Sequence, residues 1–390
     1  MKTLLLLNNA YWPSIGGVEN SLRHLAQVAQ EEGWNVKLVV GDIGLNSVRG
    51  GCASGEVDGI HILQYPLKPI PYAGPLNFFL SAVAQIRLLR RLYKEHPGAI
   101  VISRFHLSTV AARCVGFRQI RYLVPGSVAV QYTAGMTRAQ LARSPLLLLK
   151  RALHIALQRH ALRLSTVYVF SNSMKRQCIE LLPASSASIR LTKPGVDSLR
   201  FALTGDENMG AIRQELELPL NEKLVLFVGR FVPAKGVDVL IDAMTLLPDD
   251  VILILVGEGV SEADYRKQIS MRGLEGRVHI RKPTKDVESY YKACDAFAMT
   301  SNYEPLGQTI LEAMASGLPV VAFSRKAGVL TATEELGLDE FIEYANRYVA
   351  IDLAECIKAQ LKRSKRQNQM GSERVLEKYS WPKLLDDLTN

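Results

Sequence analysis

The chain has 390 residues, 48% of them hydrophobic and 22% charged, and at roughly 150 residues per domain this length predicts two globular domains. No apolar run approaches the ~18 residues that cross a bilayer, so we expect no membrane-spanning helix. The five cysteines are scattered and form no C-x-x-C pair, which indicates neither a disulfide framework nor a zinc site and favours a reducing, cytoplasmic setting.

Charge is distributed unevenly along the chain. Residues 1–194 carry 23 Lys and Arg against 8 Asp and Glu, whereas residues 195–390 carry 24 against 30. A basic field such as that of the first half attracts nucleic acid, anionic lipid or phosphorylated substrates. The two halves are therefore expected to bind different partners.

The first half alternates short apolar strands with helical patterns. Its opening, MKTLLLLNNA, has an apolar run of four residues, too short for the ~7–15-residue core of a signal peptide, so it predicts a first buried strand. Strands are predicted at Thr3–Leu7, Asn35–Val40, Ile60–Leu63, Ala99–Ser103, Arg121–Val124 and Val167–Phe170. Helices are predicted at Val18–Glu32, Asn77–His96 and Pro145–Leu164.

The second half repeats this alternation. Strands are predicted at Leu224–Val228, Val251–Val256, Val278–Ile280, Ala296–Met299 and Val320–Ala322, and helices at Val237–Leu246, Asp264–Met271, Lys285–Ala293 and Thr309–Ser316. Such alternation predicts two Rossmann-like α/β domains with parallel sheets. Lys193-Pro194-Gly195 interrupts the pattern where the charge balance changes, which predicts domains at 1–194 and 195–376. Ligands of open α/β sheets bind at the carboxyl ends of the strands, so facing domains would form an interdomain cleft.

Two carboxylates eight residues apart, Glu304 and Glu312, mark the most informative segment. Glu304 follows a predicted buried strand, and Pro305 and Gly307 shape a turn whose free N–H groups open a helix, a natural anion site. Glu312 lies within that otherwise apolar helix. The competing interpretation is a charged helix start and a solvated helix residue.

A second cluster, Gly229, Arg230 and Lys235, follows the first predicted strand of the second half. Gly229 permits close approach of a ligand, and the two cations could neutralise a departing diphosphate. A basic surface loop is the alternative. The tripeptide Gly257-Glu258-Gly259 is a weaker signal for a base or ribose site and equally fits a tight turn; it lacks the G-x-G-x-x-G of a dinucleotide fold.

The run EPLGQTILEAMASGLPVVA, with its E-x7-E spacing, resembles the donor site of GT-B glycosyltransferases of the large retaining type, the family 4-like group 1 enzymes that include many bacterial polysaccharide and lipid-sugar transferases. The resemblance implies that Glu304 approaches the transferred sugar and that Glu312 binds the ribose. It further implies that Arg230 and Lys235 bind the donor phosphates. The remaining donor contacts implied are Gly229, Gly257, Glu258, Gly259, Leu306, Gly307, Gln308 and Thr309.

The family resemblance extends to both ends of the chain. The loop Tyr11–Glu19 is similar to a P-x-x-G-G-x-E loop that faces donor phosphate and acceptor, which makes Gly16 and Gly17 candidate donor ligands at a helix start. Tyr379-Ser380-Trp381 resembles the start of the family's last helix, so the segment at about 377–390 is expected to pack back on the first domain.

Acid–base chemistry points to His106, which follows the predicted strand Ala99–Ser103 and could relay a proton near neutral pH. A surface histidine is the competing interpretation. The family usually places another histidine after the next strand, where this chain has Val124-Pro125-Gly126-Ser127 instead. The chain also has Pro194-Gly195-Val196-Asp197 where relatives have N-G-V-D.

Two basic helices suggest where an acceptor binds. Asn77–His96 and Pro145–Leu164 combine Arg and Lys with Phe and Leu, a composition that suits either an anionic lipid surface or core helices with a solvated face.

The sequence therefore predicts a cytoplasmic hexosyltransferase that moves a sugar, with retention, from a nucleotide-diphosphate sugar, such as a UDP-sugar, to a saccharide or lipid-linked acceptor. Peripheral contact of the basic half with the inner face of an anionic membrane is a further expectation. No essential metal or other cofactor is expected, since neither an Asp-x-Asp nor a His-rich ligand set occurs. The alternatives are a GT-B-type nucleotide-sugar epimerase, a non-catalytic sugar-nucleotide-binding or scaffold protein, and nucleic-acid binding, which only the basic half supports.

Overall fold

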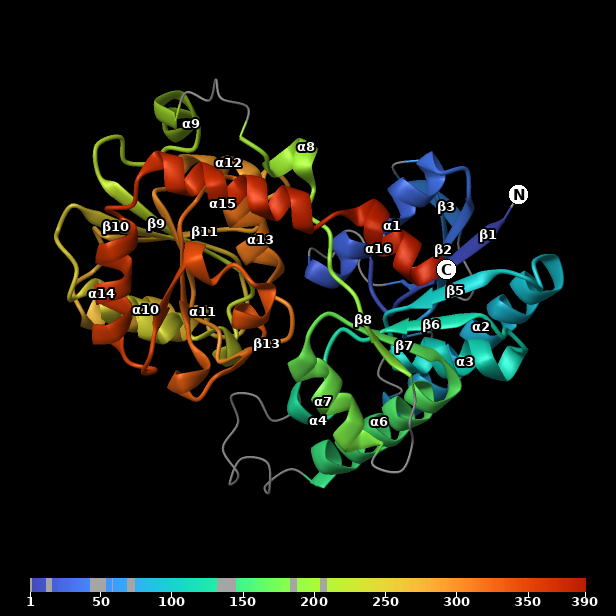
Figure 1. Ribbon diagram of the computed structural model, residues 1–390. Helices are drawn as coiled ribbons and strands as arrows, with labels where there is room; N and C mark the ends of the chain where they lie inside the picture. Colours follow the sequence, from blue (N-terminus) through green and yellow to red (C-terminus); the bar gives the residue numbers. More distant parts are fainter. Residues whose placement is uncertain are drawn as a thin grey trace. The chain divides into compact units, whose positions relative to one another are not determined.

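A computed structural model describes residues 2–11, 16–42, 54–57, 59–68, 74–131, 145–182, 188–203 and 209–390. The chain divides into an N-terminal unit, Met1–Gly195 with Trp381–Asn390, and a C-terminal unit, Val196–Ser380 (Figure 1). Each unit is an α/β domain with its own sheet. Among the described helices, none has the length and apolar character that crossing a bilayer requires.

The N-terminal unit is built on an eight-stranded sheet of order β3-β4-β2-β1-β5-β6-β7-β8. The strands are β1 (Thr3–Leu7), β2 (Asn35–Gly41), β3 (Ser54–Val57), β4 (Ile60–Tyr65), β5 (Ile100–Ser103), β6 (Ile120–Leu123), β7 (Thr166–Val169) and β8 (Ile189–Leu191). All neighbours pair in parallel except β3 and β4. The predicted parallel sheet is confirmed, whereas the edge strands β3 and β8 were not predicted.

Helices cover both faces of this sheet because β1 alternates its side chains between two cores. Leu4 and Leu6 pack with α1 (Gly17–Glu31) and α16 (Trp381–Thr389), while Leu5 and Leu7 pack with α2 (Gly74–Glu95) and α3 (His106–Val115). A third core lies under the remaining helices, α4 (Val128–Gln131), α6 (Pro145–Leu164) and α7 (Asn172–Leu181).

The C-terminal helix α16 is part of the N-terminal unit. The Trp381 ring stacks on His24 of α1 with ring centroids 5.1 Å apart. Thr192 Oγ1 donates a hydrogen bond of 2.6 Å to Asp387 Oδ2, and Trp381, Leu384, Leu385 and Leu388 are buried in the same core as Leu4. The end of the chain thus completes the first domain.

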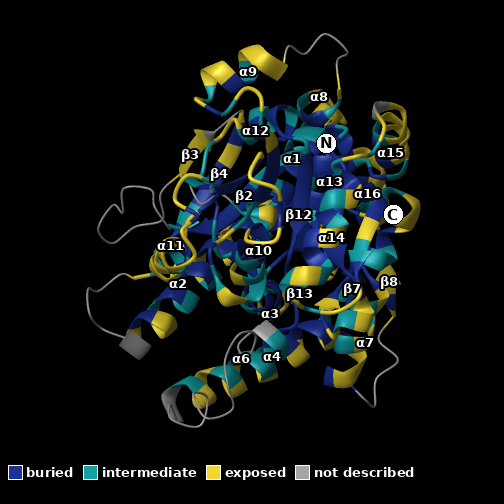
Figure 2. Ribbon diagram, turned by 90° about the vertical axis from the view of Figure 1, so that its left-hand side faces the viewer, coloured by how far each residue is buried: buried dark blue, intermediate teal, exposed yellow. Residues whose placement is uncertain are grey.

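The C-terminal unit has a six-stranded parallel sheet of order β11-β10-β9-β12-β14-β16. Its strands are β9 (Lys223–Val228), β10 (Val251–Val256), β11 (Val278–Arg281), β12 (Ala296–Met299), β14 (Val320–Phe323) and β16 (Ile342–Ala345), with a separate pair β13 (Tyr303–Glu304) and β15 (Leu330–Thr331). The main strands are buried, in contrast to the outer face of α11 (Figure 2). Strands β13, β15 and β16 were not predicted.

Eight α-helices and four short 3-10 turns of the C-terminal unit surround this sheet in the described residues. The helices are α8 (Ser198–Phe201), α9 (Met209–Glu215), α10 (Val237–Met244), α11 (Glu262–Met271), α12 (Val287–Ala293), α13 (Gln308–Ala315), α14 (Ala350–Gln360) and α15 (Lys365–Lys378). The turns are η1 (Pro233–Lys235), η2 (Arg325–Ala327), η3 (Thr333–Leu336) and η4 (Asp339–Phe341).

Candidate functional site

The predicted donor residues of the C-terminal unit follow three strands that are neighbours in its sheet. Gly229 follows β9, Gly257 follows β10, and Glu304 lies five residues after β12. Because β10, β9 and β12 run parallel, their carboxyl ends lie along one edge of the sheet. The structure therefore gathers these segments at the edge where α/β proteins bind ligands.

Lys235 and Glu304 form an ion pair at this edge, although they are far apart in the sequence. Two hydrogen bonds fix the turn η1 that carries Lys235: Thr300 Oγ1 donates to the Lys235 carbonyl at 2.8 Å, and Asn302 N donates to the Ala234 carbonyl at 3.0 Å. The side chains of Lys235 and Glu304 are 20% and 13% exposed. The pair is thus largely shielded from water yet still accessible to a ligand.

The Glu304 carboxylate also caps the start of α13. Gly307 adopts a left-handed conformation (φ 84°) that suits glycine, and its N–H donates to Glu304 Oε1 at 3.3 Å. Burial by itself would raise the pKa of Glu304, but the Lys235 ammonium and the amides of Gly307 and Leu306 outweigh burial and hold that pKa below its ordinary value. Glu304 is therefore ionised at neutral pH. Its negative charge is already paired with the Lys235 ammonium and with backbone amides just before α13.

Glu312 is buried, 9% exposed, on the apolar face of α13. Tyr291 Oη of α12 donates a hydrogen bond of 3.1 Å to Glu312 Oε2. Burial raises the pKa of Glu312 to about 7, against the lowering effects of the Tyr291 hydrogen bond and of the Arg200 charge. The interpretation of Glu312 as a solvated surface residue is thereby excluded.

The raised pKa of Glu312 predicts that its replacement by glutamine changes stability in a pH-dependent way. A carboxyl group whose pKa is about 7 when folded and about 4.5 when unfolded destabilises the fold progressively as pH rises between these values. We expect Glu312→Gln to raise the free energy of unfolding at pH 8, by an amount on the order of 3 kcal/mol, and to leave it nearly unchanged at pH 4.5. Urea unfolding at both pH values measures this, with the exposed Glu340→Gln as control. An equal effect at both pH values would contradict the buried-acid interpretation.

The glycines after β10 serve a packing role. A Cβ on Gly257 would clash with the Gly229 carbonyl, and one on Gly259 would clash with the Phe231 backbone. The Phe231 N–H donates to the Glu258 carbonyl at 2.8 Å. The loop after β10 thus supports the loop after β9, while the side chains of Glu258 and Arg230 are exposed.

Gln308 and Thr309, the first two residues of α13, are half-buried beside Gly307. Leu306 is also half-buried. In addition, a Cβ on Gly229 would lie 3.9 Å from Lys235 Cε. The structure therefore brings Gly229, Lys235, Glu304 and the start of α13 together.

Candidate residues of the N-terminal unit lie at the carboxyl edge of its own sheet. Gly16 is the N-cap of α1 and Gly17 its first residue, while residues 12–15 of the same motif lie outside the described residues. The interpretation of His106 as a surface residue is wrong, because it is 6% exposed and begins α3. Helix α3 was not predicted, and its N-cap residue Phe105 makes no side-chain capping bond that would mark its start.

His106 pairs with a second histidine that the sequence did not single out. His106 Nε2 lies 2.9 Å from His154 Nδ1 of α6. Burial, together with a smaller effect of His154, lowers the pKa of His106 to about 3. His106 is therefore neutral and, in this arrangement, a weak base.

Three further residues belong to these sites. Tyr291 holds Glu312, and Arg200 both pairs with Glu288 at 2.6 Å and influences the Glu312 charge. Arg104 directly follows β5 and is buried. Only Arg104 carried a sequence signal, a charge immediately after a predicted strand that is mostly apolar.

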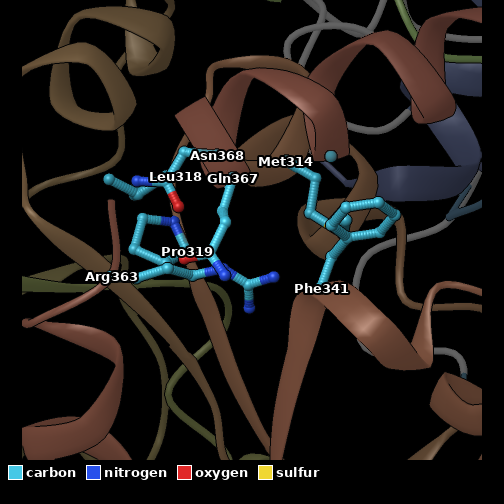
Figure 3. Close-up of a pocket in the computed structure, with 8 residues that line it drawn as sticks. Met314, Leu318, Pro319, Phe341, Arg363, Gln367 and Asn368 are labelled. Carbon is cyan, nitrogen blue, oxygen red and sulfur yellow. The ribbon is translucent and has the colours of Figure 1, made fainter. Parts of the chain in front are cut away.

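Figure 3 shows a small cavity lined by Met314, Leu318, Pro319, Phe341, Arg363, Gln367, Asn368 and Gly371. Met314 lies near the C-terminal end of α13, whereas Glu304 precedes the start of that helix. Its volume of about 10 Å³ has room for one water molecule. Within the described part of the chain, Arg363 Nε and Asn368 Oδ1 are buried without a hydrogen-bond partner, and one water could satisfy both. The cavity is too small for a sugar and is not part of the candidate site.

Comparison with known sequences finds similarity to glycosyltransferases, mainly in the C-terminal unit. The model of the family "Glycosyl transferases group 1" matches residues 208–374. The lipopolysaccharide core biosynthesis glycosyltransferase LpsE of Rhizobium meliloti is 38% identical over 120 residues, 30% of this chain and 35% of that one. A D-inositol 3-phosphate glycosyltransferase of Corynebacterium aurimucosum is 30% identical over 229 residues, 55% of this chain and 53% of the relative. The chain thus spans about a third to a half of the length of these relatives.

Solved structures match along the whole chain. Sucrose-phosphate synthase from Thermosynechococcus elongatus has a TM-score of 0.81 at 20% identity, covering 100% of this chain and 97% of that one. HepE from Anabaena, in complex with UDP-glucose, has a TM-score of 0.74 at 18% identity, covering 100% and 98%. WaaG, a glycosyltransferase involved in lipopolysaccharide biosynthesis, has 0.74 at 17% identity, covering 99% and 100%. The family model thus matches residues 208–374 of the C-terminal unit, and the two Rossmann-like units with their whole-chain structural matches show that the chain has the GT-B fold.

Proposed function

We propose that the protein is a hexosyltransferase that moves a sugar from a nucleotide-diphosphate sugar to a hydroxyl of a saccharide or lipid-linked acceptor, with retention of configuration. The observation that carries the proposal is the Lys235–Glu304 pair against the start of α13. One cation, one carboxylate and the start of a helix meet there at the carboxyl edge of a parallel sheet. The binding of UDP-glucose by the similarly folded HepE supports a UDP-sugar as donor.

Transfer breaks the bond between the anomeric carbon and the phosphate oxygen, and the electron pair leaves with the nucleoside diphosphate. The acceptor oxygen forms the new bond to that carbon. Lys235, the exposed Arg230 and the amides of Gly307 and Gln308 would stabilise the negative charge of the diphosphate as it departs. No metal or other cofactor is part of the proposal.

Glu304 has an exchange role in this proposal. In the free protein its carboxylate forms an ion pair with the Lys235 ammonium and accepts a hydrogen bond from the Gly307 amide. These are the two groups that would bind the donor diphosphate. Donor binding would replace the carboxylate at the amides by phosphate and free Glu304 to accept hydrogen bonds from sugar hydroxyls. In the absence of donor, the Lys235 and Glu304 charges thus stay paired with each other.

Glu312 would bind the ribose. Ribose hydroxyls donate to a carboxylate, so donor binding favours ionised Glu312 and should strengthen as pH rises through about 7. Gly257, Glu258 and Gly259 complete the proposed donor contacts beside Gly229.

The N-terminal unit would hold the acceptor. Gly16 and Gly17, at the start of α1, would offer N–H groups to the substrates, and His106 stays the candidate for the acceptor proton. Because the pKa of His106 is about 3 in the free protein, a proton-relay role requires that a bound acceptor changes its pairing with His154.

A screen of nucleotide sugars by thermal shift, with EDTA present, tests the proposed function. We expect one donor to raise the melting temperature of the wild type and to lose this effect in Glu312→Ala, while Glu340→Ala keeps it. Incubation with that donor alone should leave it largely intact. Rapid conversion without acceptor would favour an epimerase, and the absence of any stabilising donor would favour a non-catalytic protein.

The proposal includes contact with the cytoplasmic face of an anionic membrane. Helix α2 contacts the middle of α6, since the rings of Phe78 and His154 have centroids 6.2 Å apart. Apolar side chains there are exposed, by 64% at Phe79 and 69% at Leu149, and Lys150 beside them is exposed. Apolar and basic groups on one surface suit an anionic lipid interface.

We expect the double variant Phe79→Ser/Leu149→Ser to bind phosphatidylglycerol vesicles at least ~10-fold more weakly than the wild type, because it removes two apolar groups from the contact. Co-sedimentation at low and high salt measures this. Leu246→Ser, an exposed apolar position of the C-terminal unit, is the matched control. Equal sedimentation of all three proteins would contradict membrane contact through this surface.

A further inference from the structure

Arg104 is a buried cation with two unpartnered guanidinium nitrogens in the described part of the chain. It directly follows β5, is 3% exposed, and its Nε and Nη1 atoms have no hydrogen-bond partner in the described ranges. Arg213, equally buried at 5%, shows the usual arrangement. Its guanidinium donates to the carbonyls of Ala293, Leu220 and Glu222 and to Asp295. A guanidinium buried without such partners is costly unless a ligand supplies them.

The position of Arg104 is set by the sheet. Its N–H donates to the Leu7 carbonyl at 2.9 Å, which ties it to the carboxyl end of β1. The guanidinium carbon lies 5.4 Å from the centre of the Phe170 ring. That ring packs on the cation but accepts no conventional hydrogen bond. Arg104 is therefore held at the edge where three strands, β1, β5 and β7, end.

The start of α1 lies beside Arg104. Glu19, in the first turn of α1, interacts electrostatically with Arg104, and a Cβ on Gly16 would clash with the Glu19 carboxylate. At this helix start Gly16 is half-buried and Gly17 is exposed, and helix starts favour anions. Burial lowers the pKa of Arg104 to about 10, so the side chain keeps its charge at neutral pH.

We propose that Arg104, together with the start of α1, binds a phosphate or carboxylate group carried by the acceptor. The planar guanidinium matches two oxygens of such a group, and the helix start adds N–H donors. This inference rests on the proposed function, because it names the acceptor class of that site. The donor diphosphate is the other source of the same chemistry, but its charge is already matched by Lys235 and the start of α13 in the C-terminal unit.

Inorganic phosphate tests the site directly on the full chain. We expect phosphate at about ten times its Kd to raise the melting temperature of the wild type by roughly 3–5 °C over chloride of equal ionic strength. Arg104→Met should lose this shift, and Arg104→Lys should lose most of it, because lysine keeps the charge without the planar fork. Arg118→Met removes the same charge from an exposed position before β6 and should keep the shift. An undiminished shift in Arg104→Met would overturn the proposal, as would no phosphate shift in the wild type.

The thermal shift induced by UDP distinguishes an acceptor site at Arg104 from a donor site. We expect the UDP-induced shift to be the same in Arg104→Met and the wild type. Loss of the UDP shift together with the phosphate shift would assign Arg104 to the donor diphosphate and overturn the acceptor assignment. If UDP and nucleotide sugars stabilise no form of the protein, the proposed function fails, while the phosphate comparison still decides whether Arg104 binds an anion.

Discussion

Lys235→Met is expected to lower kcat/KM for the nucleotide sugar by roughly 10²–10³-fold, mostly through kcat. Lys235 is the one described cation paired with Glu304 at the start of α13. In the proposed reaction its ammonium meets the charge that develops on the diphosphate, and one such electrostatic group is worth this much in comparable sites. Methionine keeps the length of the side chain and removes the charge.

The same substitution should cost stability. It leaves the Glu304 carboxylate buried without its cation, so the pKa of Glu304 should rise above its present lowered value. Since both side chains retain some exposure, we expect a loss of about 1–2 kcal/mol at pH 7 rather than the larger loss of a fully buried pair.

Kinetics with the donor found in the screen, alongside urea unfolding, measure both effects. Lys267→Met, at an exposed position of α11, is the control for loss of one positive charge. A decrease of only a few-fold in kcat/KM, with folding intact, would show that other groups stabilise the leaving diphosphate.

The fold could be predicted where apolar strands stand out from their surroundings. Strands β1, β10 and β12 have the predicted bounds because each is a continuous apolar run. Strand β3, with the sequence SGEV, lies at the sheet edge and is too polar for a strand signal. Helix α7 has a capping Ser171 that accepts from Met174 N, a start signal that was overlooked.

The candidate site could be predicted only in part. The spacing of Glu304 and Glu312 is a local pattern, so the sequence displays it directly. The Lys235–Glu304 and Tyr291–Glu312 contacts join separate strands and helices, and no local pattern records them. The burial of His106 could not be predicted, because His106 begins α3 and no capping residue in the sequence marks the start of that helix. Local patterns in the sequence therefore predict which residues matter, whereas contacts between residues far apart in the chain are seen only in the structure.

Glu304→Gln is the second substitution with a large expected effect, a roughly 10²–10³-fold decrease in kcat/KM. The amide keeps the size of the side chain but presents an NH2 group that cannot accept from Lys235, and it weakens the proposed hydrogen bonds to the sugar. Binding of the nucleoside diphosphate alone should change little, because the phosphate contacts of Lys235 and Gly307 stay in place.

Combining Glu304→Gln with Lys235→Met tests whether the two residues act as a pair. Each single variant leaves one partner without its counter-charge, whereas the double variant leaves neither, so the double loss in stability should be about 1–2 kcal/mol smaller than the sum of the single losses. The pKa of Glu304 is lowered in the fold, so its contribution to stability is present at pH 7 and lost as pH falls below the ordinary carboxyl range. The stability difference between wild type and Glu304→Gln should therefore shrink on acidification, as urea unfolding across this range would measure. Additive losses in the free energy of unfolding would mean that Lys235 and Glu304 act independently. Losses that do not change with pH would mean that their ion pair contributes nothing to stability.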